Sequence, residues 1–273
     1  MMKTKWTRNI AWITASALGF VGIQAQAYQY EIGVLYGHAD LPLSGLTGAE
    51  SDTLGIGGDF YLTPVDVTNR PRGEAAFLAQ ATSFGVSYLS TDFEDDFTGL
   101  DEDESALVVG GRYVDVGSGL VLEADIFAAD ADGYRIAGGM YISDDSQVLL
   151  SWASDDESQV DELGVGFKSV TPYIGDSFLG LEADISRSSI DSDGVDADWT
   201  TISADGTYFV TPLASFGVGL GFGSGDIDST EYRVFGELFL NDNVGVGASY
   251  EVVDYDEFDG EEKTWLLTAF LRQ

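Results

Sequence analysis

Pairs of carboxylates two residues apart are the first groups in this sequence that could do chemistry. Glu123 and Asp125 form one pair, and Glu182 and Asp184 form another. In an extended strand both members of a pair point to the same side, about 7 Å apart, and glycosidases use two carboxyl groups near that distance. Acids recur in the same way along the chain, so a charged wall explains the pairs better than one active site does.

A hydrolase triad would have to be built on His38, because it is the only histidine. No hydrolase signature surrounds it, and we interpret His38 as a solvated loop residue. The chain has no cysteine, which excludes a thiol nucleophile, a thiolate metal site, disulfides and a lipid-attachment cysteine. The sequence therefore predicts a protein that is not an enzyme.

Two acidic segments, 130–133 and 191–194, resemble the middle of a calcium-binding loop. The position where a bidentate glutamate should close the loop is Gly139 in one and Thr200 in the other. We interpret both segments as Asp/Gly turns, with weak binding of divalent cations as the alternative. No metal site and no cofactor are predicted.

The first 27 residues have the pattern of a cleaved secretion signal. Lys3, Lys5 and Arg8 precede an apolar run over 10–23, which ends in Ala-Gln-Ala at 25–27. The run is short for a membrane-spanning helix, and the cleavage pattern follows it directly. We expect residues 1–27 to be removed and residues 28–273 to form one domain.

The net charge is −35, and it becomes −38 once Lys3, Lys5 and Arg8 are removed. Such a chain is not expected to bind nucleic acid. Its hydrophobic content of 44% and aromatic content of 12% also argue against disorder. The acids must therefore be segregated from the apolar residues.

That segregation follows a period of two in segments of about ten residues, as in strands with one apolar and one polar face. Over 28–37, Tyr28, Tyr30, Ile32, Val34 and Tyr36 alternate with polar and small residues. Aromatic residues at both ends of the apolar face are typical of membrane barrels. Fourteen such segments predict an all-β, transmembrane, antiparallel up-and-down barrel of about 14 strands, with 12 or 16 as alternatives.

The connections between these segments alternate in character. Those at 114–119, 211–215 and 240–243 are short with few acids, whereas those at 91–105, 154–162, 188–199 and 253–262 are acidic. A barrel with short periplasmic turns and polar outer loops has this division, and a soluble β-sandwich does not. We therefore expect the acidic connections to lie outside the cell.

Two stretches resemble the putative general bacterial porin family: 28–40 and, more specifically, 59–88. In the second, the aromatic pair Phe60-Tyr61, then Pro64 and Pro71, and the run at 74–78 occupy the family's places. Arg72-Gly73 departs from the expected Leu-Ala. The resemblance implies a pore in the outer membrane of a Gram-negative bacterium, and it supplies no catalytic residues.

Charged residues on the predicted inward faces are the candidate pore lining. Arg112 should reach Glu123 across a short turn, and Arg135 should reach Asp125. Glycines 217, 219, 221 and 223 alternate on one inward face, where they widen a lumen or let something pack closely. The predicted pore-lining residues are Glu31, Asp59, Arg112, Glu123, Asp125, Arg135, Glu162, Lys168, Glu182, Asp184, Asp205, Glu231, Arg233, Glu237 and Glu251.

Acids outnumber bases in this lining, so the sequence predicts a passive pore for small hydrophilic solutes that favours cations. Its expected surroundings are outer-membrane lipid and lipopolysaccharide. The connection near 128–133 is too short to fold inward, so we expect wall side chains to form any constriction. The alternative is a closed or plugged barrel that acts as a structural or adhesive surface protein through its acidic loops. The sequence defines no oligomeric state.

Overall fold

A computed structural model describes residues 27–43, 46–95, 100–129, 132–155, 160–192, 195–226, 228–256 and 261–273. The predicted signal peptide lies outside this range except for Ala27, and the two segments that resemble calcium loops lie partly outside it. Among the described residues, no helix is long and apolar enough to span a membrane.

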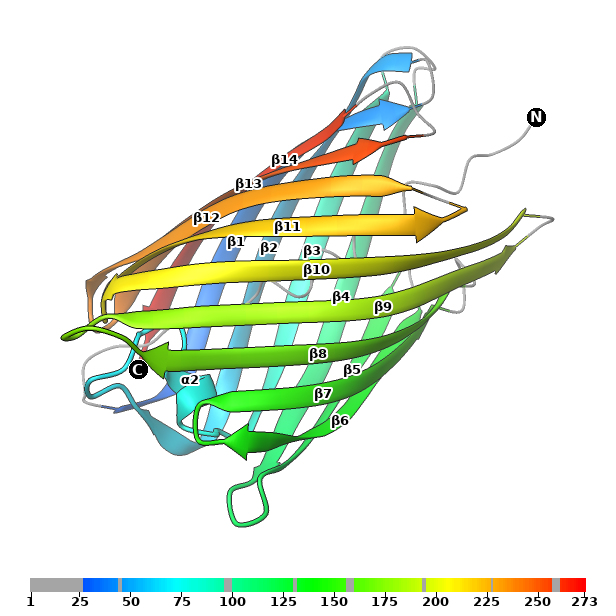
Figure 1. Ribbon diagram of the computed structural model, residues 1–273. Coiled ribbons are helices and arrows are strands. Elements are labelled where there is room, and N and C mark those ends of the chain that lie inside the picture. The colour runs from blue at the N-terminus through cyan, green and yellow to red at the C-terminus, as the bar shows by residue number, and fades with distance from the viewer. Residues whose placement is uncertain are drawn as a thin grey trace.

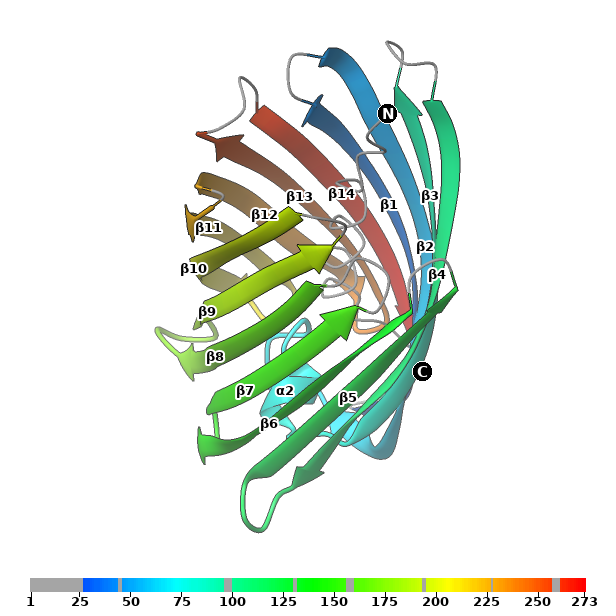
Figure 2. The same ribbon diagram turned by 90° about the vertical axis from the view of Figure 1, so that its right-hand side faces the viewer.

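The chain forms a closed antiparallel barrel of 14 strands, each hydrogen-bonded to its neighbours in sequence (Figure 1 and Figure 2). The barrel closes where β1 pairs with β14, from Glu31 opposite Arg272 to Asp40 opposite Lys263. The predicted fold class and strand number are confirmed. The strands are β1 Ala27–Leu43, β2 Leu46–Asp66, β3 Ser83–Asp95, β4 Leu100–Asp115, β5 Leu120–Ala129, β6 Gly133–Ser143, β7 Ser146–Asp155, β8 Val160–Pro172, β9 Phe178–Ser192, β10 Val195–Thr211, β11 Ala214–Gly225, β12 Ser229–Asn241, β13 Val244–Tyr255 and β14 Glu261–Arg272.

Every strand presents large apolar side chains on the outside of the barrel. A soluble protein does not surround itself with a continuous apolar ring, whereas a membrane barrel requires one. The alternation seen in the sequence is therefore the division between lipid and lumen. One such residue per strand, between 40% and 62% exposed, is Ile32, Ile56, Val86, Val109, Ile126, Ile136, Leu150, Val165, Leu181, Ile202, Val218, Val234, Val246 and Leu267.

Aromatic side chains gather at both ends of this ring. Near the short turns, Phe60 lies between Tyr30 and Phe84, with ring centroids 5.1 Å apart in both pairs. Near the opposite end, Tyr36 contacts Trp265 at 5.2 Å. These positions match the aromatic girdles of membrane barrels, where amphipathic rings sit at the two lipid–water interfaces.

Tyr28 departs from the predicted lipid-facing set. The ladder between β1 and β2 shifts register between Tyr28 and Tyr30, so the period of two is broken there. Tyr28 is only 4% exposed and packs edge-on against Tyr61, with centroids 5.4 Å apart. A bulge of this kind depends on the partner strand, and the alternation within β1 alone does not reveal it.

The acidic connections are largely strand rather than loop. β3 continues to Asp95 and β4 begins at Leu100, so most of the predicted loop 91–105 pairs as a ladder. The same holds for the stretch 188–199 between β9 and β10. Antiparallel strands can go on pairing above the hydrocarbon region, where water solvates their carboxylates. The prediction of loops was wrong in conformation.

The opposite end of the barrel has tight turns, as predicted. In the turn between β4 and β5, the Asp115 carboxylate accepts hydrogen bonds from the Gly117 N–H at 3.1 Å and the Ser118 hydroxyl at 2.6 Å. The hydrogen bond from the Ser118 hydroxyl has the largest effect in lowering the pKa of Asp115, and the one from the Gly117 N–H lowers it further. Gly119 closes the turn with a φ of +74°, a conformation that glycine adopts at little cost.

The two ends predict a labelling pattern. The chain has no native cysteine, so Asp103→Cys and Ser118→Cys would each introduce a single thiol, both at exposed positions. A maleimide on a polymer too large for outer-membrane pores should label the Asp103→Cys variant in intact cells. It should label the Ser118→Cys variant only after the membrane is permeabilised. If intact cells were labelled in the Ser118→Cys variant alone, the orientation would be reversed.

Candidate functional site: the charged inner wall and the plug

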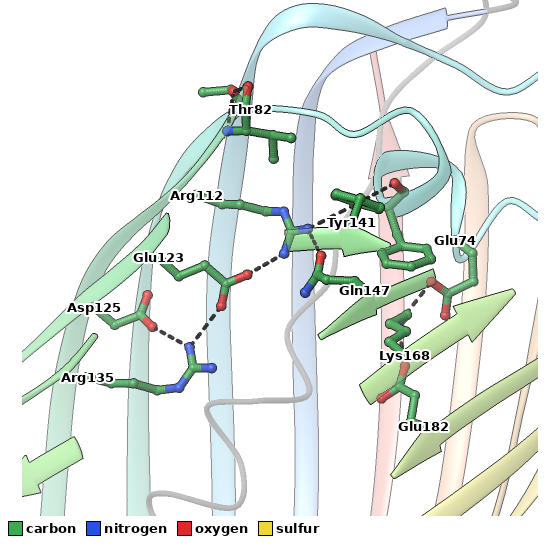
Figure 3. A network of polar contacts seen from close by, with 12 residues as sticks. Glu74, Thr82, Arg112, Glu123, Asp125, Arg135, Tyr141, Gln147, Lys168 and Glu182 are labelled. Carbon is green, nitrogen blue, oxygen red and sulfur yellow. Dashed lines mark hydrogen bonds and ion pairs between the residues drawn. The ribbon is translucent and has the colours of Figure 1, made fainter. Parts of the chain in front are cut away.

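Arg112 and Arg135 join three strands of the inner wall through shared acids (Figure 3). Arg112 pairs with Glu123, and Arg135 contacts Glu123 at 3.2 Å and Asp125 at 3.3 Å. The pairs between Arg112 and Glu123 and between Arg135 and Asp125 lie where they were expected. The second contact of Arg135 was not foreseen, and it makes one continuous charged network across β4, β5 and β6.

Lys168 on β8 bridges the wall to a segment inside the barrel. Its ammonium group pairs with Glu182 on β9, its direct partner in the ladder, and with Glu74 at 2.9 Å. Glu74 lies in the connection between β2 and β3 and was not predicted as a lining residue. The lysine is thereby held by two carboxylates from different parts of the chain (Figure 3).

Two further arginines contact acids of the inner wall. Arg233 on β12 lies 2.6 Å from Asp205, 3.7 Å from Glu251 and 4.0 Å from Glu231. Arg272 on β14 lies 3.9 Å from Glu31, which also accepts a 2.9 Å hydrogen bond from the Tyr61 hydroxyl. Both residues of this second pair are only 3% exposed. Neither Tyr61 nor Arg272 was among the predicted pore-lining residues.

Four predicted lining acids form no ion pair among the described residues: Asp59, Glu162, Asp184 and Glu237. Glu162 accepts a 3.1 Å hydrogen bond from the neutral Ser188 hydroxyl. The expectation that pairing does not neutralise the wall therefore agrees with these contacts. In formal charge, the acids of the inner wall named above outnumber its bases.

The connection 67–82 between β2 and β3, here called the plug, lies within the end of the barrel that carries the short turns. It contains the helical turn α2, Ala75–Leu78 (Figure 1 and Figure 2). Besides Lys168 on β8, the plug contacts Tyr141 on β6, whose hydroxyl donates to the Phe77 carbonyl at 2.8 Å. It also contacts Arg272 on β14, which donates to the Arg72 carbonyl at 2.6 Å. A segment that touches β6, β8 and β14 must cross the mouth of a closed barrel.

Arg72 fastens the plug to the rim. Its guanidinium group lies 2.7 Å from the Asp242 carboxylate in the turn between β12 and β13. Its backbone N–H donates to the Pro212 carbonyl in the turn between β10 and β11 at 2.8 Å. At Gly73 a side chain would collide with the Glu237 carboxylate on β12. The departure Arg72-Gly73 seen in the sequence is thus where the plug meets the far wall.

Apolar contacts hold the rest of the plug. Phe77 packs against the cluster of Val114, Val121 and Tyr141 and also against a second cluster that contains Val170 and Phe209. Because Phe77 contacts both clusters, apolar packing attaches the plug to the wall in addition to the ion pairs and hydrogen bonds. Burial of an aromatic ring contributes several times more to stability than an exposed ion pair.

The plug corrects the expectation that wall side chains alone form any constriction. The sequence suggested that the connection near 128–133 is too short to fold inward, but the inward segment is the one after β2. The inner wall is also less polar than expected, since Leu35 and Leu89 on inward faces are 1% and 4% exposed. Packing inside the barrel is therefore partly apolar.

The structure places His38 differently from the prediction. His38 lies within β1 rather than in a loop, and its Nδ1 is 3.2 Å from the Asp52 carboxylate. Its ring lies 5.7 Å from that of Trp265, and Asp40 is its other charged contact. Within the described ranges, no three potential ligands gather to hold a metal ion.

A hollow of about 240 Å³ runs along the inner wall from β2 to β6. Its lining combines glycines and serines with charged side chains, including Asp59, Arg112, Glu123 and Asp125. This is the composition of a wetted surface rather than of an apolar ligand pocket. A closed barrel with an apolar exterior, aromatic girdles and a charged, partly hollow interior defines the class of outer-membrane β-barrels.

Comparison with known proteins agrees with that class. Residues 39–160 match the family described as putative general bacterial porin, which confirms the resemblance found in the sequence. The description of this family names a porin, which agrees with the outer-membrane barrel that the fold defines. No curated protein matches the chain closely enough to be informative.

Solved structures of outer-membrane proteins share the fold. The outer membrane protein Omp33 of Acinetobacter baumannii is 19% identical, with a TM-score of 0.63 over 92% of this chain and all of the other. A bacterial polysaccharide outer membrane secretin is 8% identical, with a TM-score of 0.53 over 90% of this chain and 99% of the other. At these identities the likeness establishes the fold alone.

The plug contacts predict that Phe77→Ala weakens the protein. A fully buried Phe→Ala change costs about 3–5 kcal/mol, and Phe77 is only half-buried. We therefore expect the free energy of unfolding, measured in urea after refolding into detergent, to fall by about 2 kcal/mol. Tyr141→Phe, which removes only a hydroxyl, should cost about 1 kcal/mol. Equal stability of wild type and Phe77→Ala would mean that the plug is not packed as described.

Proposed function

We propose that this protein is a passive diffusion pore for small hydrophilic solutes and that it prefers cations. The mature chain is residues 28–273 after removal of the signal peptide 1–27, and the barrel is surrounded by outer-membrane lipid and lipopolysaccharide. The match of residues 39–160 to a porin family supports the pore itself. The cation preference rests on this chain's own side chains.

The observation that carries the preference is the set of inner-wall carboxylates without a basic partner among the described residues: Asp59, Glu162, Asp184 and Glu237. Most basic side chains of the wall are already paired with several acids, because Arg135, Lys168 and Arg233 each contact at least two carboxylates. A low-dielectric wall focuses the field of uncompensated charges into the lumen. Cations are therefore concentrated along the path and anions are depleted.

The plug favours a second candidate function. A segment that crosses the mouth and contacts β6, β8 and β14 narrows the barrel. If it closes the lumen, the protein is the plugged structural or adhesive barrel. We favour the pore because the hollow along β2–β6 is lined by charged residues of the barrel wall. Conductance in a planar bilayer separates the two functions.

The first prediction is the sign of the reversal potential in a KCl gradient. It should indicate cation preference at about 0.15 M salt, where the Debye length is about 8 Å, and weaken near 1 M, where it is about 3 Å. Acidification toward about pH 4, the ordinary titration range of carboxyl groups, should also weaken it. Anion preference, or a preference that ignores both salt and pH, would overturn the proposal. A complete lack of conductance would favour the plugged barrel.

The second prediction separates Glu182 from Asp184. Replacing both by Gln and Asn should lower the cation preference without unfolding the barrel. Asp184→Asn alone should give most of that decrease, because Asp184 has no basic partner among the described residues whereas Glu182 is paired with Lys168. Reversal potentials of the two single variants and the double variant provide the measurement. A larger effect of Glu182→Gln than of Asp184→Asn would contradict the prediction that passing ions sense mainly the Asp184 carboxylate.

A further inference from the structure

Inward acids of this barrel repeatedly stand opposite glycine in the neighbouring strand. Direct partners in a ladder point to the same face of the sheet. A glycine partner therefore leaves an empty place on the inner wall beside the acid. Such pairs in the described ladders include Asp59 with Gly85, Asp125 with Gly110, Asp184 with Gly166, Asp205 with Gly219 and Glu231 with Gly221, as well as Glu237 with Gly247.

In the first five of these pairs the carboxylate occupies that empty place. A Cβ atom built on Gly85 would lie 2.5 Å from the Asp59 Oδ1 atom, and one on Gly166 would lie 2.6 Å from the Asp184 Oδ1 atom. At Gly221 the distance to the Glu231 Oε2 atom would be 2.7 Å, and Gly110 and Gly219 are blocked in the same way. All of these distances are far inside van der Waals contact. The acids thus lie along the wall, over glycine, instead of extending into the lumen.

A glycine whose empty place holds a carboxylate is here called a glycine seat. At two of these seats the carboxylate forms no ion pair among the described residues. Asp125 and Asp205 also have arginine partners, which could hold them at the wall without help. Asp59 and Asp184 have no such partner in the described part of the chain, so the empty place above Gly85 or Gly166 is what accommodates their carboxylates. The position of the charge then depends on a residue that has none.

We infer that Gly166 and Gly85 are positioning residues for ion selectivity, because they let the carboxylates of Asp184 and Asp59 lie against the wall. This inference deepens the proposed cation-preferring pore and rests on it. The seat keeps the lumen wide and sets the distance between the fixed charge and a passing ion. Coulomb energy varies inversely with that distance, so moving the carboxylate changes selectivity without changing the number of charges.

Gly166 is the cleaner of the two positions to test. A Cβ atom on Gly166 would have Oδ1 and Cγ of Asp184 within 4 Å, and these atoms are the far end of a flexible side chain. Gly85 would in addition approach the Gly58 carbonyl oxygen at 3.2 Å. Gly166→Ala should therefore displace the Asp184 carboxylate into the lumen with little strain on the backbone.

The experiment is a double-mutant cycle measured by single-channel recording. Gly166→Ala should reduce conductance and shift the reversal potential further in the cation direction at low salt. Asp184→Ala should lower the cation preference, and in that background Gly166→Ala should have no further effect on selectivity. Gly206→Ala is the control, because that glycine has nothing within 4 Å of a built Cβ atom. An equal effect of Gly166→Ala with and without Asp184 would overturn the inference.

A second measurement does not depend on conduction. Asp184→Cys introduces the only thiol, and its reaction with a small cationic methanethiosulfonate can be followed in detergent. Gly166→Ala should raise that rate severalfold, whereas Gly206→Ala should not. A raised reaction rate in a barrel that does not conduct would support the positioning role of Gly166 and contradict the proposed pore. An unchanged reaction rate in a conducting barrel would contradict the positioning role of Gly166 and leave the proposed pore intact.

Discussion

The structure depends on the requirement that backbone N–H and C=O groups within a bilayer be paired inside the protein. For a β-sheet this means that no edge is left, and the ladder between β1 and β14 removes the two edges. Closure in turn divides each strand into a lipid face and a lumen face. The apolar ring outside and the charged wall inside are consequences of that single constraint.

Confinement of the acids to the lumen creates the next problem, since like charges repel at short range. Arg135, Lys168 and Arg233 reduce that repulsion by contacting two or more acids each, as Arg233 does with Asp205, Glu231 and Glu251. The remaining carboxylates lie over glycine or accept neutral donors. Charge balance inside the barrel is therefore incomplete, and this incompleteness is the physical origin of the proposed selectivity.

The plug connects the rim of the barrel to this charged wall. Lys168 contacts Glu74 on the plug and Glu182 on the wall, and Tyr141 joins Phe77 to Arg112 through its hydroxyl. A displacement of the plug would break contacts that also fix lining side chains. The width of the lumen and the arrangement of its charges are thus coupled.

The fold class and strand number followed from the sequence, because alternation with period two is a local property that any ten residues of a strand display. The neighbouring pairs, such as Arg112 with Glu123 across a short turn, were predictable for the same reason. The role of the connection after β2 was not, because its partners Lys168, Asp242 and Arg272 come from strands and turns far along the chain. The Arg72-Gly73 departure was a signal, but a sequence does not say what an arginine meets.

The burial of Tyr28 and the continuation of strands through the acidic stretches were likewise decided by partner strands, whose register is a property of the sheet. The same holds for the glycine seats. Gly166 and Asp184 could each be assigned to an inward face from the sequence. Their position opposite one another depends on the register between β8 and β9. Apart from Tyr28 at the bulge, the sequence by itself determined which face the strand residues named here occupy, because the face depends on position along the residue's own strand. Only the tertiary structure decided what each residue touches, because contacts require the register of the closed barrel.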